Sequence, residues 1–216
     1  MLEIKNLSVR FGSIEILRNI HLSVPQGAIV GLLGRNGAGK TTTLRTIMGL
    51  VKPEAGSLTF DGIDLTRVAA YGRTAMGFGY APEDRRLIPD MTVEENLSLP
   101  AWALKWKDIK GRLDGVYKLI PEVREFGPRR AMQLSGGQQK LVAIGRALVT
   151  GSRLLLLDEP FEGVAPALSK RIAEVIGTLR GAGLTVVLSG ADLQHASSVL
   201  DTVYRIDRGQ MAASAK

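Results

Sequence analysis

One segment limits the fold of this chain more than any other. The apolar run "AIVGLL", Ala28 to Leu33, leads directly into "GRNGAGKT", Gly34 to Thr41. A short run that is apolar throughout is typical of a strand buried on both faces of a sheet, and the apolar stripe over residues 44–51 predicts a helix. A strand, a glycine-rich turn and a helix in this order form a loop that holds phosphates. The segment therefore predicts an α/β fold built around a nucleotide site.

The residues of this loop have distinct tasks. Its glycines allow successive backbone N–H groups to turn toward phosphate oxygens. We expect Lys40 to bring its charge to the β- and γ-phosphates and the Thr41 hydroxyl to ligate Mg²⁺. A chance glycine-rich turn is the alternative, and the flanking strand and helix argue against it. The predicted nucleotide-binding residues of the loop are Gly34, Arg35, Asn36, Gly37, Ala38, Gly39, Lys40, Thr41 and Thr42.

A second buried strand is predicted at Leu154 to Leu157, in "LLLLDEP", and two acids follow it. We expect Asp158 to hold the Mg²⁺ shell through water. Glu159 is placed to polarise an attacking water as a general base. Two acids could simply mark a strand that leaves the core, but the phosphate loop elsewhere in the chain favours the catalytic interpretation.

The segment "LSGGQQK", Leu134 to Lys140, precedes another apolar helical stripe. Exposed backbone N–H groups at the start of a helix attract anions. Because the chain already has a phosphate loop, we infer that this second anion site reaches the γ-phosphate held by another subunit. The predicted cross-subunit contacts are Ser135, Gly136, Gly137 and Gln138.

Other segments extend the predicted fold. Alternating apolar residues predict strands over 2–11, with one shift of register, and over 20–24, and "GSLTFDG" predicts an antiparallel strand. Residues 94–148 are predicted to be mostly helical, with breaks at "LIPE" and "FGPRR", and a helix over 168–179 precedes the strand "LTVVL". Strands that alternate with helices indicate a mainly parallel sheet covered on both faces. Residues 211–216 are expected to fray.

In their order, and over essentially the whole chain, the phosphate loop, "LLLLDEP" and "LSGGQQ" resemble the ATP-binding cassette (ABC) family. The resemblance implies an ATPase that uses ATP and Mg²⁺ and pairs with a second ATPase subunit, identical or not. It also implies the P-loop NTPase fold of this family in a single domain, with an N-terminal antiparallel part. The implied boundaries are about 1–85 and 150–216 for the nucleotide-binding core and 86–149 for an inserted helical subdomain.

The resemblance assigns further residues. Phe11, in "RFG", falls where the family places an aromatic ring against adenine, although a lone aromatic residue is more often part of a core. Glu83, in "GYAPEDRR", occupies a position where many members have glutamine. A carboxylate there can ligate Mg²⁺ or water, so Glu83 is predicted as a catalytic and metal-binding residue.

Two departures from the family pattern lie near the predicted catalytic residues. Phe161 and Glu162 replace the small polar residues that are usual in the dimer-facing loop. Ala191 stands where most members place a histidine that contacts the γ-phosphate, and His195 is four residues further on, in a predicted helix. A methyl group can neither donate a hydrogen bond nor carry charge, so the isolated subunit is expected to be a weak ATPase.

Several segments resemble one branch of the family, the ATPases of branched-chain amino acid importers and their urea or amide relatives. They are "PEDRRLIPDMTVEENL", "VYKLIPEV", "LSGGQQKLVAIGRAL" and "EGVAP". This branch implies transmembrane permease subunits, a periplasmic solute-binding protein and a location on the cytoplasmic face of the inner membrane. Residues near Trp102, Trp106 and Tyr117, with the loop around Glu83, are expected to border the groove that receives a permease helix. The sequence does not identify the solute.

Composition bears on the alternatives. The chain of 216 residues has no cysteine and two histidines, which excludes disulfides and makes a zinc site unexpected. Its formal charge of +7 would suit an ATPase that acts on nucleic acid. The charges are scattered, however, and such ATPases usually carry a coiled-coil insertion or a second cassette, so no nucleic acid partner is expected. No apolar run approaches the roughly 20 residues of a membrane span, whereas exporters more often have the cassette fused to such spans.

Overall fold

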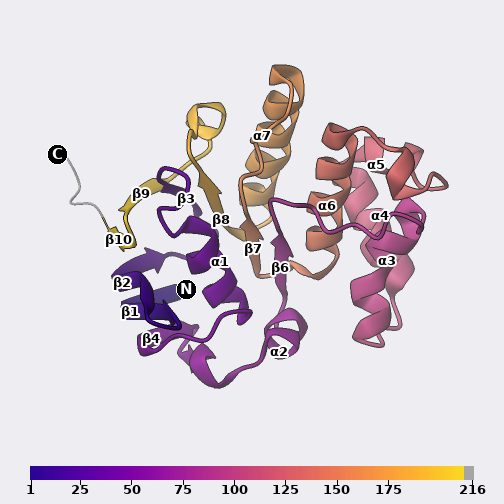
Figure 1. The fold of residues 1–216 in the computed structure, drawn as a ribbon. Helices are drawn as coiled ribbons and strands as arrows, with labels where there is room; N and C mark the ends of the chain where they lie inside the picture. Colours follow the sequence, from indigo (N-terminus) through magenta and orange to yellow (C-terminus); the bar gives the residue numbers. More distant parts are fainter. Residues whose placement is uncertain (212–216) are drawn as a thin grey trace.

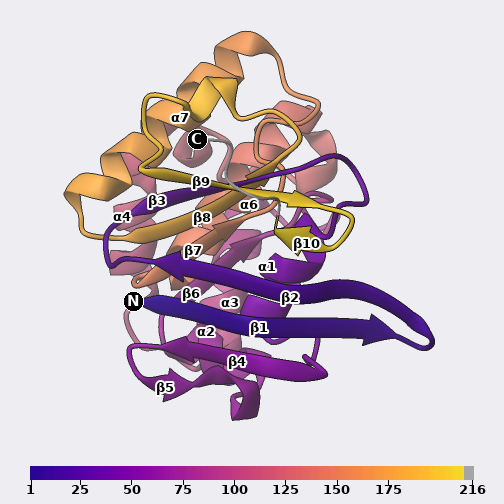
Figure 2. The same cartoon turned by 90° about the vertical axis from the view of Figure 1, so that its left-hand side faces the viewer.

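The computed structural model describes residues 1–211, which form two β-sheets and a set of helices gathered largely to one side (Figure 1). The smaller sheet is antiparallel, with the strand order β2-β1-β4-β5, and Figure 2 shows its strands below the larger sheet. Its strands are β1 (Leu2–Phe11), β2 (Ile14–Val24), β4 (Ala55–Phe60) and β5 (Ile63–Asp64). The predicted register shift in β1 is present between Ile4 and Leu7, where Asn6 has a φ of 51°, and pairing with β2 is irregular at two further points, between Leu7 and Val9 and between Val9 and Arg10.

The larger sheet has six strands in the order β10-β9-β3-β8-β7-β6. All neighbouring strands run parallel except β10, which is antiparallel to β9. The strands are β3 (Ile29–Leu33), β6 (Phe78–Ala81), β7 (Leu154–Leu157), β8 (Thr185–Gly190), β9 (Thr202–Asp207) and β10 (Gln210–Met211). The mainly parallel sheet is thus confirmed, and β6, β9 and β10 were not predicted.

Both faces of this sheet are buried, and successive residues of one strand serve opposite faces. Leu155 and Leu157 of β7 pack with α6 (Gly136–Thr150) and α7 (Pro166–Gly181). Leu154 and Leu156 pack on the other face, with α1 (Lys40–Met48) and the antiparallel sheet. Burial on both faces explains why β3 and β7 are apolar throughout.

Three further α-helices lie beyond α6 (Figure 1). They are α3 (Val93–Ala103), α4 (Ile109–Leu119) and α5 (Pro121–Glu125), while α2 (Ala70–Ala75) lies near β6. The predicted break at "LIPE" falls on Ile120, between α4 and α5. Pro121 is the first residue of α5, a position where the backbone N–H makes no helical hydrogen bond, so proline is well tolerated there. Since α6 packs on β6 and β7 as well as on α3, it joins the helical region to the sheet. The division at 86–149 stays a prediction.

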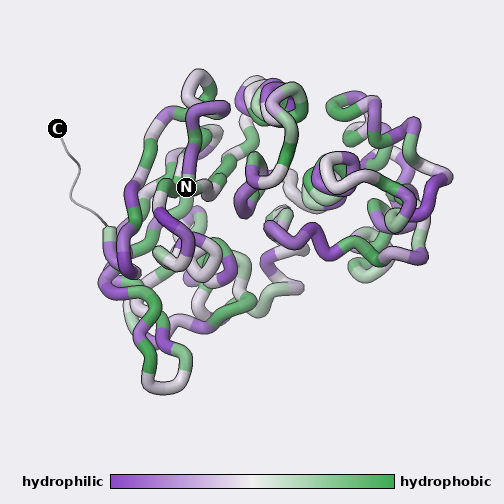
Figure 3. The backbone as a smooth tube through the Cα atoms, turned by 45° about the horizontal axis from the view of Figure 1, so that its top comes forward, coloured by the Kyte–Doolittle hydropathy of each residue, from purple (hydrophilic) through white to green (hydrophobic). Residues whose placement is uncertain are grey.

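Hydrophobic and hydrophilic stretches are interspersed along the chain (Figure 3). Among the residues that the structure describes, no helix combines the length and the apolar character that a membrane span requires. Residues 211–216 were expected to fray, but Met211 lies in β10 and pairs with Ile206 of β9. Residues 212–216 of this segment lie outside the described residues.

Candidate nucleotide and catalytic site

The predicted site residues follow the carboxyl ends of four neighbouring parallel strands. The loop from Gly34 follows β3, Ala191 follows β8, Asp158 and Glu159 follow β7, and Glu83 comes after β6. The order β3-β8-β7-β6 places these segments side by side along one edge of the sheet. Such an edge is where open α/β sheets bind ligands.

The loop between β3 and α1 requires glycine at two points. Gly39, the N-cap of α1, has a φ of 109°, and a Cβ there would lie 2.6 Å from the side chain of Leu17. A Cβ at Gly34 would lie 2.4 Å from the carbonyl oxygen of Ile206. The loop therefore packs closely against its neighbours and leads into the N-terminus of α1. The N-terminus of a helix favours the binding of anions.

Lys40 and Glu159 form an ion pair inside this loop. Lys40 Nζ lies 2.9 Å from Glu159 Oε1, and the side chains are 4% and 7% exposed. The same ammonium donates to the carbonyl oxygens of Gly34 at 2.7 Å and Arg35 at 3.1 Å. Lys40 is thus held where phosphate oxygens can replace its present partners.

Asp158 is the centre of a buried hydrogen-bond network. Its Oδ1 accepts from Thr41 Oγ1 at 3.0 Å and from Ser189 Oγ at 2.8 Å. Its Oδ2 accepts from the Tyr80 hydroxyl at 3.1 Å. Burial, together with the negative charge of Asp158, raises the pKa of Tyr80 far above its ordinary value, so this hydroxyl stays a donor. The hydroxyl and carboxylate oxygens of Thr41 and Asp158 fit the ligand preference of Mg²⁺.

Glu159 is fixed through its backbone as well as its carboxylate. Its φ of 48° lies in the left-handed region, which non-glycine residues seldom adopt. The Glu159 N–H donates to Ser189 Oγ at 3.1 Å, and Oε2 accepts from the N–H of Ala191 at 3.2 Å. Although Ala191 has only a methyl side chain, its backbone therefore supplies a donor to the predicted base.

A cleft of about 440 Å³ lies in front of these residues. Its walls include Phe11, which is 51% exposed, and Glu83, with Lys40 and Thr41 between them. Partial desolvation, and then the negative charges of Glu162, Asp158 and Glu159, raise the pKa of Glu83. In the described part of the chain Glu83 is not gathered with Asp158 and Glu159 into a three-carboxylate metal site.

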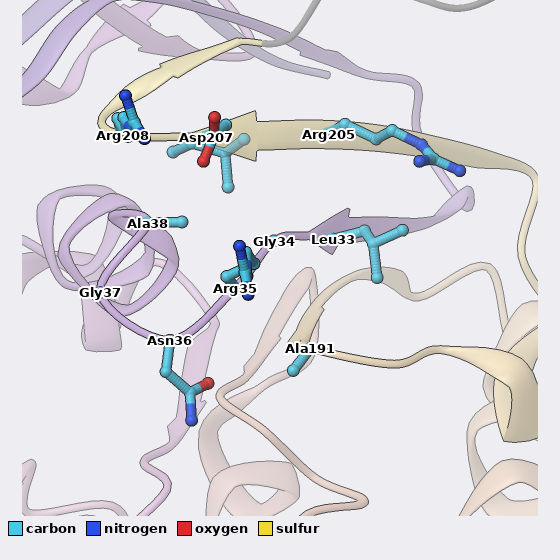
Figure 4. Close-up of a pocket in the computed structure, with 11 residues that line it drawn as sticks. Leu33, Gly34, Arg35, Asn36, Gly37, Ala38, Ala191, Arg205, Asp207 and Arg208 are labelled. Carbon is cyan, nitrogen blue, oxygen red and sulfur yellow. The ribbon is translucent and has the colours of Figure 1, made fainter.

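A second cavity, of about 640 Å³, lies along the phosphate loop between β9 and Ala191 (Figure 4). The predicted residues Gly34 to Ala38 line it, together with Arg205 and Arg208. The two cavities share Asn36 and Gly37, so the loop is open to solvent on two sides.

The four predicted cross-subunit residues lie at the start of α6 and line neither of these two cavities. Ser135 is the N-cap of α6: its Oγ accepts from the N–H of Gln138, and Gln138 Oε1 accepts from the N–H of Ser135. Ser135 and Gly136 are exposed. This helix start therefore contributes to neither of the cavities that the phosphate loop of the same chain lines.

The expected helix around His195 is a single 3-10 turn, η3 (Gln194–Ala196). The His195 ring lies 6.0 Å from the ring of Phe161, centroid to centroid. Both residues line a small cavity together with Glu159 and Ala191. His195 is therefore near the predicted base, and it lies against the aromatic residue that departs from the family pattern.

Sequence reasoning missed Tyr80, Ser189 and Lys140. Ser189 could have been found, since it lies in β8 directly before the turn that holds Ala191. Tyr80 lies in β6, a strand that was not predicted. Lys140 ends the segment "LSGGQQK", and its Nζ donates to the carbonyl oxygen of Glu159 at 2.7 Å.

Comparisons with known proteins agree with this geometry. The sequence model of a family described as "ABC transporter" matches residues 17–162. The chain is 36% identical over 211 residues to a high-affinity branched-chain amino acid transport ATP-binding protein, BraG, of Pseudomonas aeruginosa, covering 98% of this chain and 91% of that protein. It is 33% identical over 216 residues to the lipopolysaccharide export system ATP-binding protein LptB of Haemophilus influenzae, covering 99% and 90%.

Solved structures give the same picture. A nucleotide-free ATP-binding cassette from an ABC transporter superposes with a TM-score of 0.87 at 28% identity, covering 99% of this chain and 90% of that one. A dimeric bacterial ABC transporter cassette superposes with a TM-score of 0.88 at 27% identity, covering 99% and 97%.

Proposed function

Since the chain belongs to the ABC transporter family and is an ATPase of that family, we propose that it powers the import of branched-chain amino acids or a related small solute. The ATPase activity is supported by the position of Lys40, Glu159 and Asp158, which lie close together at one edge of the sheet. The 36% identity to BraG over 98% of the chain supports the import part.

Binding of ATP uses the residues around the cleft. Phe11 stacks on the adenine ring, and the backbone of Gly34 to Gly39 holds the phosphates. Lys40 leaves Glu159 and binds the β- and γ-phosphate oxygens. Thr41 and Asp158 would hold Mg²⁺, whose charge would offset that of the phosphates. Glu83 lines the same cleft and orients water through its carboxylate.

Hydrolysis depends on Glu159. Once Lys40 is drawn to the phosphates, the Glu159 carboxylate is free to accept a proton from a water aligned with the γ-phosphate. Ser189 and Ala191 hold its backbone and its carboxylate, so its orientation is set before the reaction. Ala191 offers no side-chain donor to the γ-phosphate, which limits the rate in the isolated subunit.

The complete site requires two chains. Ser135, Gly136, Gly137 and Gln138 at the start of α6 contact the nucleotide held by a second ATPase subunit, identical or different. A helix start with exposed N–H groups is suited to phosphate, and a dimeric cassette is among the similar structures. ATP then binds between the chains, and its binding closes the dimer.

The helical region transmits the conformational change driven by ATP to the permease subunits. Trp102 is 47% exposed on α3, and exposed aromatic residues are favoured anchors at interfaces. Trp106 and Tyr117 pack against the core cluster, so they support the docking surface rather than form it. In this proposal the chain binds its permease at the cytoplasmic face of the inner membrane, and a periplasmic solute-binding protein acts on it only through the permease.

Crosslinking tests this proposal. The chain has no cysteine, so Asp84→Cys and Lys105→Cys each introduce a single thiol at an exposed position on the docking side. Crosslinks from both in native membranes should reach a polytopic membrane protein, whereas Lys52→Cys, at an exposed position between α1 and β4, should give none. Crosslinks confined to a second ATPase copy would refute the docking surface.

The identity of the captured partner decides between import and a second candidate. The similarity to LptB at 33% identity favours a role in lipopolysaccharide export. Uptake of labelled leucine that is lost in a strain producing only Lys40→Ala supports import. Normal uptake together with lost lipopolysaccharide export would favour the second candidate, and capture of nucleic acid would refute both.

A further inference from the structure

Lys140 is a buried lysine that the proposed hydrolysis does not use. It lies in the first turns of α6 and is 4% exposed, which is uncommon because burial removes the water that stabilises an ammonium ion. Nζ donates to the backbone carbonyl oxygens of Glu159 at 2.7 Å and of Glu83 at 3.5 Å. Lys140 therefore ties α6 to the segments that follow β7 and β6.

Nearby acids offset only part of the cost of burying Lys140. Burial, and then the nearby Arg85, lower the pKa of Lys140 overall, and the charges of Glu83, Glu162 and Glu159 oppose this shift. A buried charge is tolerated when opposite charges and hydrogen-bond partners surround it. The carbonyl oxygens of Glu159 and Glu83 supply its hydrogen-bond partners, and the three acids offset part of the cost of burial.

The contact to Glu159 matters because the backbone of that residue is held in the left-handed region. Such a conformation persists only when the surroundings fix it. The Glu159 carbonyl oxygen accepts from Lys140 Nζ and from the N–H of Glu162, the latter at 3.2 Å. The other contacts of Glu159 come from Ser189, Ala191 and Lys40. Among these partners Lys140 alone belongs to α6.

We propose that Lys140 is a positioning residue that couples α6 to the orientation of Glu159. The same helix carries Ser135 to Gln138 at its start, so a nucleotide of the neighbouring subunit that contacts this start also acts on Glu159 through Lys140. The inference rests on the proposed roles of Glu159 as base and of the helix start as a cross-subunit contact. It assigns to Lys140 no contact with ATP.

Removal of the ammonium tests the coupling. Lys140→Met keeps most of the side-chain volume but donates no hydrogen bond, and Lys170→Met, at an exposed position of α7, is the matched control. Hydrolysis at saturating ATP should fall on the order of 10²-fold in Lys140→Met, since a misplacement of about 1 Å costs this much. KM should change less than about threefold, because ground-state binding is untouched. Lys170→Met should match the wild type.

Chemical rescue separates the charge from packing. The chain has no cysteine, so Lys140→Cys offers one thiol, which is alkylated in urea before refolding. Aminoethylation rebuilds a lysine-like ammonium, whereas ethylation restores similar volume without charge. The aminoethylated protein should recover hydrolysis and the ethylated protein should not.

Three outcomes overturn the coupling: a normal rate in folded Lys140→Met, equal recovery with both alkyl groups, or a loss confined to KM. The rescue pair keeps the test valid if Lys140→Met fails to fold. Glu159→Gln is measured alongside to separate the two proposals. A normal rate in Glu159→Gln would refute the proposed base, while a slow Glu159→Gln with a normal Lys140→Met refutes the coupling alone.

Discussion

Lys40 and Glu159 are paired with each other at 2.9 Å, although each is predicted to act on a different part of ATP. Both side chains are buried, and a buried ion pair is costly to break unless new partners replace the old ones. A triphosphate offers Lys40 such partners, and its arrival frees the Glu159 carboxylate. In the proposed mechanism, the pair keeps the Glu159 carboxylate occupied by a cation until a nucleotide is bound.

Lys40→Ala should weaken ATP binding. Truncating one partner of a buried charged pair costs about 2–5 kcal/mol, so affinity should fall roughly 30-fold or more. Calorimetric titration with MgATP measures this, and Lys52→Ala, at an exposed position, serves as the control. Unchanged affinity in Lys40→Ala would show that the loop is structural.

Glu159→Gln should bind ATP as tightly as the wild type or more tightly, because the competing partner of Lys40 loses its charge. Hydrolysis should fall roughly 10²–10⁴-fold, the usual contribution of a positioned general base. Light scattering should then detect an ATP-bound dimer that persists. A variant that turns over ATP at the normal rate would remove Glu159 from the mechanism.

Chelation of Mg²⁺ by EDTA should abolish hydrolysis, and Asp158→Asn should raise the Mg²⁺ concentration needed for half-maximal rate. The loss of charge also weakens the bonds from Thr41, Ser189 and Tyr80, each to a charged acceptor and worth about 1.5–3 kcal/mol. Asp90→Asn is an exposed control. If the Mg²⁺ dependence of Asp158→Asn is the same as that of the wild type, Asp158 does not hold the metal.

Ala191→His should raise the turnover of the isolated subunit more than it changes ATP affinity. The new imidazole would add a side-chain donor beside Glu159, where residue 191 now supplies only its backbone N–H. Steady-state phosphate release from purified protein gives both quantities. Robust hydrolysis by the wild type, unaffected by this change, would mean that another residue already supplies the donor, and His195→Ala then tests the histidine that lines the same cavity as Glu159.

The catalytic strands were predictable because each leaves a strong local signal. Leu154 to Leu157 and Ile29 to Leu33 are apolar on both faces, and the loops after them carry the motif residues. By contrast, β6 is four residues long and contains Gly79, so only its pairing with β7 makes it a strand. In β9 only Ile206 is buried, so the alternation expected of a half-buried strand is missing.

The site was predictable where a motif states its chemistry, as at Lys40, Thr41, Asp158 and Glu159. Lys140 was not, because a lysine on a helix is ordinarily a solvated residue. Lys140 is buried because the segments after β6 and β7 meet over α6. The sequence of the helix alone contains no pattern that predicts this contact. Contacts between distant segments therefore set the limit of what the sequence could predict.

The central claim, that the ATP site is shared between two chains, is tested most directly by mixing two inactive variants. Lys40→Ala lacks the phosphate-binding cation, and Ser135→Arg blocks the start of α6 while it leaves ATP binding to the monomer intact. In a mixed dimer, one site combines the intact loop of one chain with the intact helix start of the other.

Single-turnover hydrolysis of labelled ATP by a 1:1 mixture is the measurement. The mixture should reach up to about one quarter of the wild-type rate, the fraction of intact sites in randomly assorted two-fold dimers. Each variant alone should stay near background. A mixture no more active than the two variants measured separately would contradict the account, because it would place the loop and the start of α6 in the site of one chain.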